Sequence, residues 1–157
     1  MESLTPQEIL SYIGAFIVGL VYVALLWKYL RWGKTLIMIL VCFAVDTDHF
    51  LLSSQGFREH PIDNQIIMHA FHTIEFALLV IVLNLIIGIH TLKKGWKTWL
   101  IPQNNDYSTP WQFYLAWIMR IILLGVFLHF AQDIPIYAIQ WKWSYYDYSL
   151  IHYYCFW

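Results

Sequence analysis

Long apolar runs separated by short polar segments organise the 157-residue chain. A helix that crosses a membrane needs about 20 mostly apolar residues, and four segments meet this requirement. They are residues 7–30, 34–52, 64–92 and 110–139, followed by a tail at 140–157. We therefore predict an all-α protein whose single polytopic membrane domain, residues 1–157, is a four-transmembrane-helix bundle.

Two short motifs mark where helices begin. Thr5-Pro6-Gln7-Glu8 precedes the first apolar run, and Thr109-Pro110-Trp111-Gln112 precedes the last. In each motif a threonine is followed three residues later by Glu or Gln, which is the pattern of a capping box. Proline stands at the first helical position, where its missing N–H costs nothing. Both runs are therefore predicted to start as helices at these prolines.

The composition supports a membrane environment and argues against nucleic acid. Hydrophobic residues make up 60% of the chain and charged residues only 12%, whereas a soluble domain carries roughly 25% charged residues. The formal net charge is −1, so there is no excess of basic residues to bind phosphates. We expect membrane lipid as a partner, and the sequence does not indicate an oligomeric state.

Basic residues are gathered in two of the connecting loops. Lys28, Arg31 and Lys34 lie between the first two spans, and residues 93–97 contribute three lysines between the last two. Basic loops remain on the cytoplasmic side of a membrane. The prediction is an inner-membrane protein with both basic loops inside, and with both termini and the loop at residues 53–63 outside.

The tail after residue 139 is rich in aromatic residues. It contains Trp141, Trp143, Tyr145, Tyr146, Tyr148, Tyr153, Tyr154, Phe156 and Trp157. Trp and Tyr prefer the headgroup layer of a bilayer. The tail is therefore interpreted as an interfacial anchor, or alternatively as a lid over an outward-facing site.

Acidic and histidine residues enter three of the predicted spans from the same side. Ionisable residues inside a span cost about 2.5–3.5 kcal/mol each even on lenient scales, so they mark candidate functional sites. At about 1.5 Å rise per residue, Asp46, His69 and Asp133 each lie roughly 8–9 Å below the predicted outer surface. Structural polar residues have no reason to share one level, so this coincidence is the strongest functional signal in the sequence.

The spacing of these residues predicts a metal site. They form pairs three or four residues apart, so that each pair shares one helix face. Histidine nitrogen and carboxylate oxygen are the ligands of zinc and similar divalent ions. The candidate ligands, enough for one or two ions, are Asp46, Asp48, His49, His69, His72, His129 and Asp133.

Two further charged residues are predicted near the middle of the membrane. Glu75 lies about 17 Å from the outer face and Arg120 about 15 Å from the inner face, in a core about 30 Å thick. We expect these two side chains to form a structural ion pair, in preference to metal ligation by Glu75.

The polar motifs resemble those of the bacterial membrane-bound metal-dependent hydrolase family, a group of small inner-membrane proteins. The similarity covers roughly residues 40–135 and rests on Asp46-Thr47-Asp48-His49, on His69-Ala70-Phe71-His72, and on His129-Phe130-Ala131-Gln132-Asp133. Val45 and Thr73 depart from the family pattern, in which Pro and Ser are common at these places. The resemblance implies a metal-dependent hydrolase whose metal ligands are the seven residues named above, without naming a substrate.

Three functions are compatible with the acid and histidine cluster. In the first, a metal activates water to hydrolyse a lipid or amphiphilic ester or phosphoester, with Asp48 as the general base. In the second, the same residues carry a metal ion or proton across the membrane. In the third, His69 or His72 ligates a haem together with His129, although nearby carboxylates disfavour haem.

Overall fold

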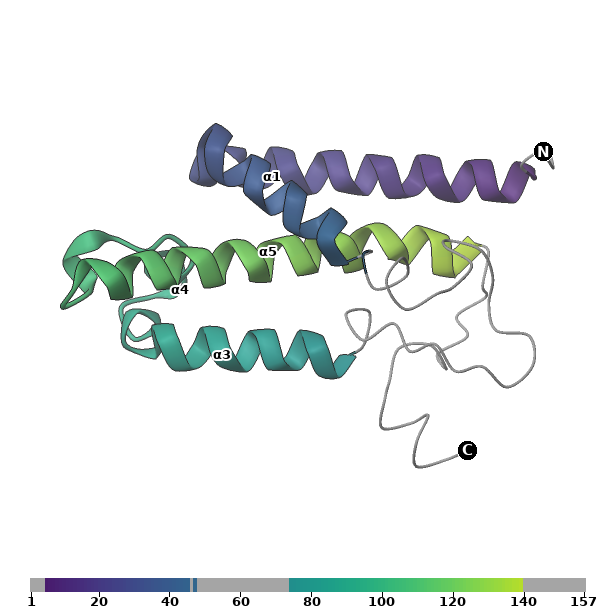
Figure 1. Ribbon diagram of the computed structural model, residues 1–157. Coiled ribbons are helices and arrows are strands. Elements are labelled where there is room, and N and C mark those ends of the chain that lie inside the picture. The colour runs from purple at the N-terminus through teal and green to yellow at the C-terminus, as the bar shows by residue number, and fades with distance from the viewer. Residues whose placement is uncertain (1–4, 46, 48–73, 140–157) are drawn as a thin grey trace, which may run out of the picture.

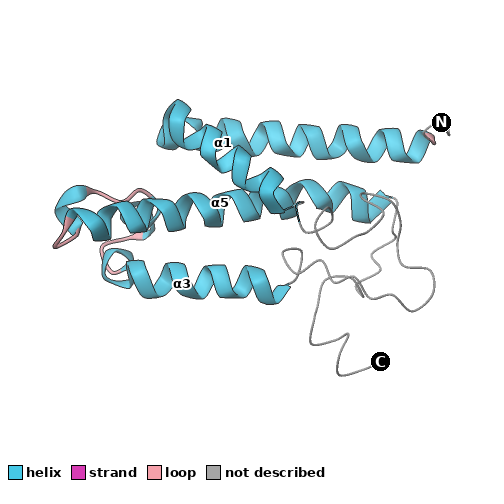
Figure 2. Cartoon of the chain, in the orientation of Figure 1, coloured by secondary structure: helices cyan, strands magenta, loops and turns pink. Residues whose placement is uncertain are grey.

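The computed structural model describes residues 5–45, 47 and 74–139, which form helices and their connections without any strand. The elements are α1 (Pro6–Val45), α3 (Ile74–Leu92), the short α4 (Trp96–Leu100), the 3-10 turn η2 (Asn104–Asp106) and α5 (Pro110–Ile139). The helical content is evident in Figure 2. The all-α prediction is confirmed for this part of the chain.

Three of these helices, α1, α3 and α5, are long and apolar enough to cross a membrane. The bounds of α5 coincide with the predicted span at 110–139, and α3 ends at Leu92 as predicted. The remainder of the spans predicted at 34–52 and 64–92, and the aromatic tail, lie outside the described residues. Large apolar side chains on the outward faces, among them Phe16, Leu25 and Ile86, are exposed. A bilayer is the solvent in which such faces are stable.

A sharp kink at Arg31 divides α1 into two arms. Its 40 residues would span about 60 Å as a straight helix, twice the apolar thickness of a membrane. Arg31 has φ 59° and ψ 178°, outside the helical region, and Figure 1 shows the chain turning back there. We call residues 6–30 the N-terminal arm and residues 32–45 the C-terminal arm. The predicted break between residues 30 and 34 is confirmed.

The two arms of α1 run in opposite directions along α5. In the N-terminal arm, a Cβ at Gly14 would lie 2.9 Å from Pro135, and the Tyr22 hydroxyl donates to the Leu124 carbonyl at 3.2 Å. In the C-terminal arm, Lys34 lies over the Trp117 ring at 3.3 Å, and the Cys42 thiol donates to Gln132 Oε1 at 3.1 Å. The N-terminal arm is therefore antiparallel to α5, and the C-terminal arm is parallel to it.

Helix α5 is the central helix, with α1 packed on one side and α3 on the other (Figure 1). The core lies mainly between α1 and α5 and consists of Leu30, Met38, Cys42, Trp117, Ile121, Leu124 and Leu128. Glycine permits a close approach of the two helices, since a Cβ at Gly125 would lie 2.6 Å from Val41. Small residues at such crossings let apolar helices pack without a gap.

Both capping boxes are formed. The Thr5 N–H donates to Glu8 Oε2 at 2.6 Å, and the Glu8 N–H donates to Thr5 Oγ1 at 3.3 Å. Thr109 and Gln112 exchange the equivalent bonds, at 3.2 Å and 3.3 Å. These bonds satisfy backbone donors that a helix start leaves unpaired, so α1 and α5 begin at Pro6 and Pro110 as predicted.

The two basic segments lie at the same end of the molecule. The kink at Arg31 adjoins the start of α5, because Lys34 covers Trp117, and the lysines of residues 93–97 follow the end of α3. We call this the basic end; the opposite end, where α5 carries His129 and Asp133, is the acidic end. The described helices thus agree with the prediction that both basic loops share one side.

The kink at Arg31 gives a testable prediction about backbone strain. Among described non-glycine residues only Arg31 has a positive φ, a conformation that costs an L-residue about 1–3 kcal/mol. Arg31→Gly should therefore leave the melting temperature in detergent unchanged or raise it. Lys28→Gly, three residues earlier in regular helix, should lower stability by about 1 kcal/mol. Equal losses in both variants would show that Arg31 is not strained.

Candidate functional site: an acidic end and a buried arginine

His129 and Asp133 form a buried pair at the acidic end of α5. Their Nε2 and Oδ2 atoms are 3.2 Å apart, and only 6% and 15% of the two side chains are exposed. The pairing follows from their spacing, because residues four apart share one face of a helix. The prediction that these two residues share one helix face is confirmed.

The carboxylate of Asp133 has capacity for a further partner. Its Oδ2 atom is buried and accepts no hydrogen bond from the described part of the chain. A buried polar atom in a native structure nearly always has a partner, so an acceptor of this kind suits a cation or another donor. Imidazole beside carboxylate is a donor set that divalent metals use, and the two residues present fit a metal site.

Both arms of α1 contact Gln132, the neighbour of Asp133 in α5. Gln132 Oε1 accepts from Cys42 in the C-terminal arm, and Gln132 Nε2 occupies the space that a Cβ at Gly19 in the N-terminal arm would need. Gln132 precedes Asp133 in α5, so these contacts place both arms of α1 at the level of the His129–Asp133 pair. Gln132 was not among the predicted site residues, although an amide in an apolar span is a usable signal.

The structure describes only two of the seven predicted metal ligands, His129 and Asp133. Asp46, Asp48, His49, His69 and His72 lie outside the described residues. Within residues 5–45, 47 and 74–139, no three His, Cys, Asp or Glu side chains gather as a metal would require. The metal site and the role of Asp48 therefore stay predictions.

Arg120 takes other partners than the predicted Glu75. Its Nε donates to the Trp99 carbonyl at 2.9 Å, and its Nη1 donates to the Asn84 carbonyl at 3.0 Å and also to the Asn84 side-chain oxygen. The guanidinium lies 4.1 Å from the centre of the Trp99 ring and is fully buried. Among the described residues, no ion pair joins Arg120 to Glu75.

The position of Asn84 explains why Arg120 contacts an amide and not the carboxylate of Glu75. Glu75 precedes Asn84 by nine residues, or about 13 Å along α3. Asn84 lies about 12 Å before the end of α3, and Arg120 about 15 Å after the start of α5, so the two share a level. Because α3 and α5 run antiparallel, an amide at this level meets the arginine. Comparing these two depths in the sequence would have identified Asn84.

Gly88 completes the arginine's surroundings. A Cβ at this position would collide with Arg120 Nη2 and would lie 2.9 Å from the Trp99 indole nitrogen. The bare backbone of Gly88 is therefore what allows the guanidinium to lie between α3 and α4. A charge in an apolar interior is tolerated only when such close partners surround it.

No protein-family model, no curated protein and no solved structure matches this chain.

Adding one methyl group at Gly88 tests the packing around Arg120. Gly88→Ala should destabilise the protein by about 1–3 kcal/mol, since overpacking displaces the guanidinium. Gly33→Ala is the matched control, because a Cβ at this helical glycine meets nothing within 4 Å. The measurement is thermal unfolding in detergent. A Gly88→Ala protein as stable as Gly33→Ala would contradict the described packing.

Removing the amide of Asn84 tests the arginine's hydrogen bonds. Asn84→Leu keeps the size of the side chain but leaves Nη1 without its side-chain acceptor, which should cost about 2–3 kcal/mol. Thr91→Val is the control in the same helix, because Thr91 is buried and donates only within α3, to the Gly88 carbonyl at 2.7 Å. A neutral Asn84→Leu would reopen the possibility of a Glu75 partner.

Proposed function

We propose that the chain is a membrane-embedded, metal-dependent hydrolase that acts on a lipid or an amphiphilic ester or phosphoester. The observation that carries this proposal is the buried His129–Asp133 pair, with Nε2 and Oδ2 3.2 Å apart and with Asp133 Oδ2 accepting no described hydrogen bond. A buried pair of this kind at one end of a long apolar helix supports a metal centre near a membrane surface.

The proposal includes a bundle of four spans. The two arms of α1 would be the first two spans, α3 would lie in the third, and α5 would be the fourth. The opposite directions of the arms along α5 support this arrangement, and each of these segments lies against α5 or continues from one that does. The positive-inside rule then orients the basic end to the cytoplasm of an inner-membrane protein.

The sequence supplies the remaining ligands at the acidic end. The C-terminal arm is described to Val45, and its Cys42 already contacts Gln132 of α5. The motif Asp46-Thr47-Asp48-His49 follows directly in the sequence. We propose that Asp46, Asp48, His49, His69 and His72 join His129 and Asp133 in holding one or two divalent ions, with zinc as the first candidate.

The chemistry follows from this donor set. A bound divalent ion supplies Lewis acidity, which polarises a phosphoryl or carbonyl oxygen and lowers the pKa of water. Asp48 would act as the general base that takes a proton from the attacking water. His129 and Asp133 would hold the ion at a fixed position along α5, because the contacts of α1 with Gln132 restrain this part of the helix. An ester bond near the headgroups of a bilayer is the substrate within reach.

Elemental analysis of the detergent-purified protein tests the proposal. The wild type should contain about one or two equivalents of zinc, manganese or iron, and His129→Gln should lower the metal affinity by about a hundredfold. His90→Gln, which changes a histidine at the basic end, should retain the metal. Metal-free protein purified without chelator would rule out this metal centre.

A second measurement separates hydrolysis from transport. Metal-dependent turnover of a lipid or phosphoester panel, lost in Asp48→Ala, is the result expected of the hydrolase. Metal flux into proteoliposomes that is lost in Asp46→Ala, without any turnover, would favour translocation.

A further inference from the structure

A hollow of about 360 Å³ lies at the basic end, between the end of α3, the start of α5 and the segment that connects them. It is far along α5 from His129 and Asp133, so it is separate from the proposed metal centre and does not rest on it. Its volume falls in the range of small-molecule sites.

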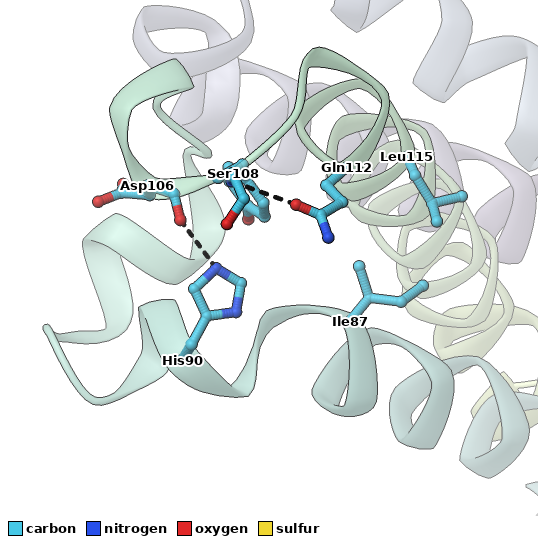
Figure 3. A pocket seen from close by; sticks show the side chains of 7 residues that line it. Ile87, His90, Asp106, Ser108, Gln112 and Leu115 are labelled. Carbon is cyan, nitrogen blue, oxygen red and sulfur yellow. Dashed lines mark hydrogen bonds between the residues drawn. The ribbon is translucent and has the colours of Figure 1, made fainter.

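The side chains around this hollow change from apolar to polar along its length (Figure 3). Ile87 and Leu115 lie at one end, His90 and Asp106 at the other, and Gln112 and Ser108 between them. Ile87 is deeper in α3 than His90, and Leu115 is deeper in α5 than Gln112. The apolar end therefore faces the middle of the bundle and the polar end faces outward. A phospholipid has the same order, from acyl chain through phosphate to headgroup.

The capping box of α5 fixes how the Gln112 amide presents itself. Gln112 Oε1 accepts from the Ser108 and Thr109 N–H groups, at 3.1 Å and 3.2 Å. Because the oxygen is held by two backbone donors, the NH2 group is the part that faces the hollow (Figure 3). The amide thus offers N–H donors to an acceptor such as a phosphoryl oxygen.

Basic residues outnumber acidic ones in the segment that connects α3 and α5, with three lysines against Asp106. Asp106 is its acidic member, and its Oδ1 is paired with the Lys94 ammonium at 2.7 Å. Lys93 and Lys97 are exposed in the same connecting segment and add positive charge to the basic end. Basic residues close to a membrane surface attract anionic lipids by about 1 kcal/mol each.

Exposed aromatic residues place the hollow at headgroup level. Trp96 is the first residue of α4, Trp111 and Tyr114 lie near the start of α5, and the three are 60%, 66% and 61% exposed. Trp and Tyr collect where the apolar core of a bilayer meets its headgroups. A ligand in a hollow at this end of the helices is therefore a membrane molecule in preference to a solute from water.

We propose that this hollow binds the phosphate of an anionic membrane phospholipid. Gln112 donates to the phosphoryl oxygens, the lysines attract the charge, and Ile87 and Leu115 pack against the first part of the acyl chain. The lipid would stabilise the junction of α3, α5 and their connecting segment.

Gln112→Glu tests this proposal while leaving the helix start intact. Glutamate at this position also completes a capping box, so α5 should still begin at Pro110, but the N–H donors are replaced by a carboxylate. Gln103→Glu is the control, because Gln103 is exposed in the same connecting segment and does not line the hollow. Both variants add the same charge.

Native mass spectrometry of the detergent-purified chain, titrated with phosphatidylglycerol, provides the measurement. The wild type and Gln103→Glu should bind one phosphatidylglycerol tightly, and Gln112→Glu should bind it about tenfold more weakly. Equal binding by Gln112→Glu and Gln103→Glu would overturn the site.

Two further titrations identify the source of the phosphate. Phosphatidylcholine should bind more weakly than phosphatidylglycerol, since it lacks the net negative charge. Millimolar inorganic phosphate should not displace the lipid; displacement would overturn the lipid assignment and indicate a site for free phosphate. Metal content is not involved in any of these readouts, so the result is independent of the proposed hydrolase.

Discussion

The buried positive charge of Arg120 is the constraint on which the arrangement of α3, α4 and α5 depends. A guanidinium enclosed by apolar helices is stable only if acceptors meet its N–H groups. Asn84 in α3 accepts from Nη1, and the Trp99 carbonyl at the end of α4 accepts from Nε. Gly88 leaves the space for Nη2, which has no acceptor among the described residues. One side chain thereby fixes α3 against α5 and draws the connecting segment back onto the bundle, where Leu100 and Ile101 pack against the core.

The packing of α1 against α5 determines how the two helices are aligned at the acidic end. The N-terminal arm of α1 approaches it closely at Gly14, and the C-terminal arm does so at Gly125, so neither arm can slide along α5 without a collision. Gln132 lies where both arms meet α5, one residue before Asp133. A regular helix places His129 and Asp133 on one face, but the height at which α1 reaches them is set by these packing contacts. The candidate site thus depends on core packing more than on its own polar bonds.

Local patterns in the sequence predicted much of the fold, because they encode local interactions. The capping motifs at Thr5 and Thr109 identified helix starts, and the basic segment around Arg31 identified the turn within α1. The partner of Arg120 was not predicted correctly. Charge complementarity suggested Glu75, whereas packing between antiparallel helices brings a neutral amide to the right level. Which residues of α1 face Gln132 depends likewise on helix rotation, and helices that are apolar on all sides do not specify a unique rotation. The convergence of the remaining predicted ligands concerns residues outside those that the structure describes.

The location of Arg120 also bears on which function the acidic end can serve. A cation or proton moving from the His129–Asp133 pair along α5 would have to pass a fixed positive charge in the half of the bundle nearer the basic end. Fixed arginines in narrow pathways repel cations, and here the buried guanidinium is packed against Gly88 and Trp99. A pathway through the middle of these helices is therefore disfavoured. A reaction confined to the acidic end requires no such passage, and this asymmetry favours hydrolysis near one membrane surface over transport across it.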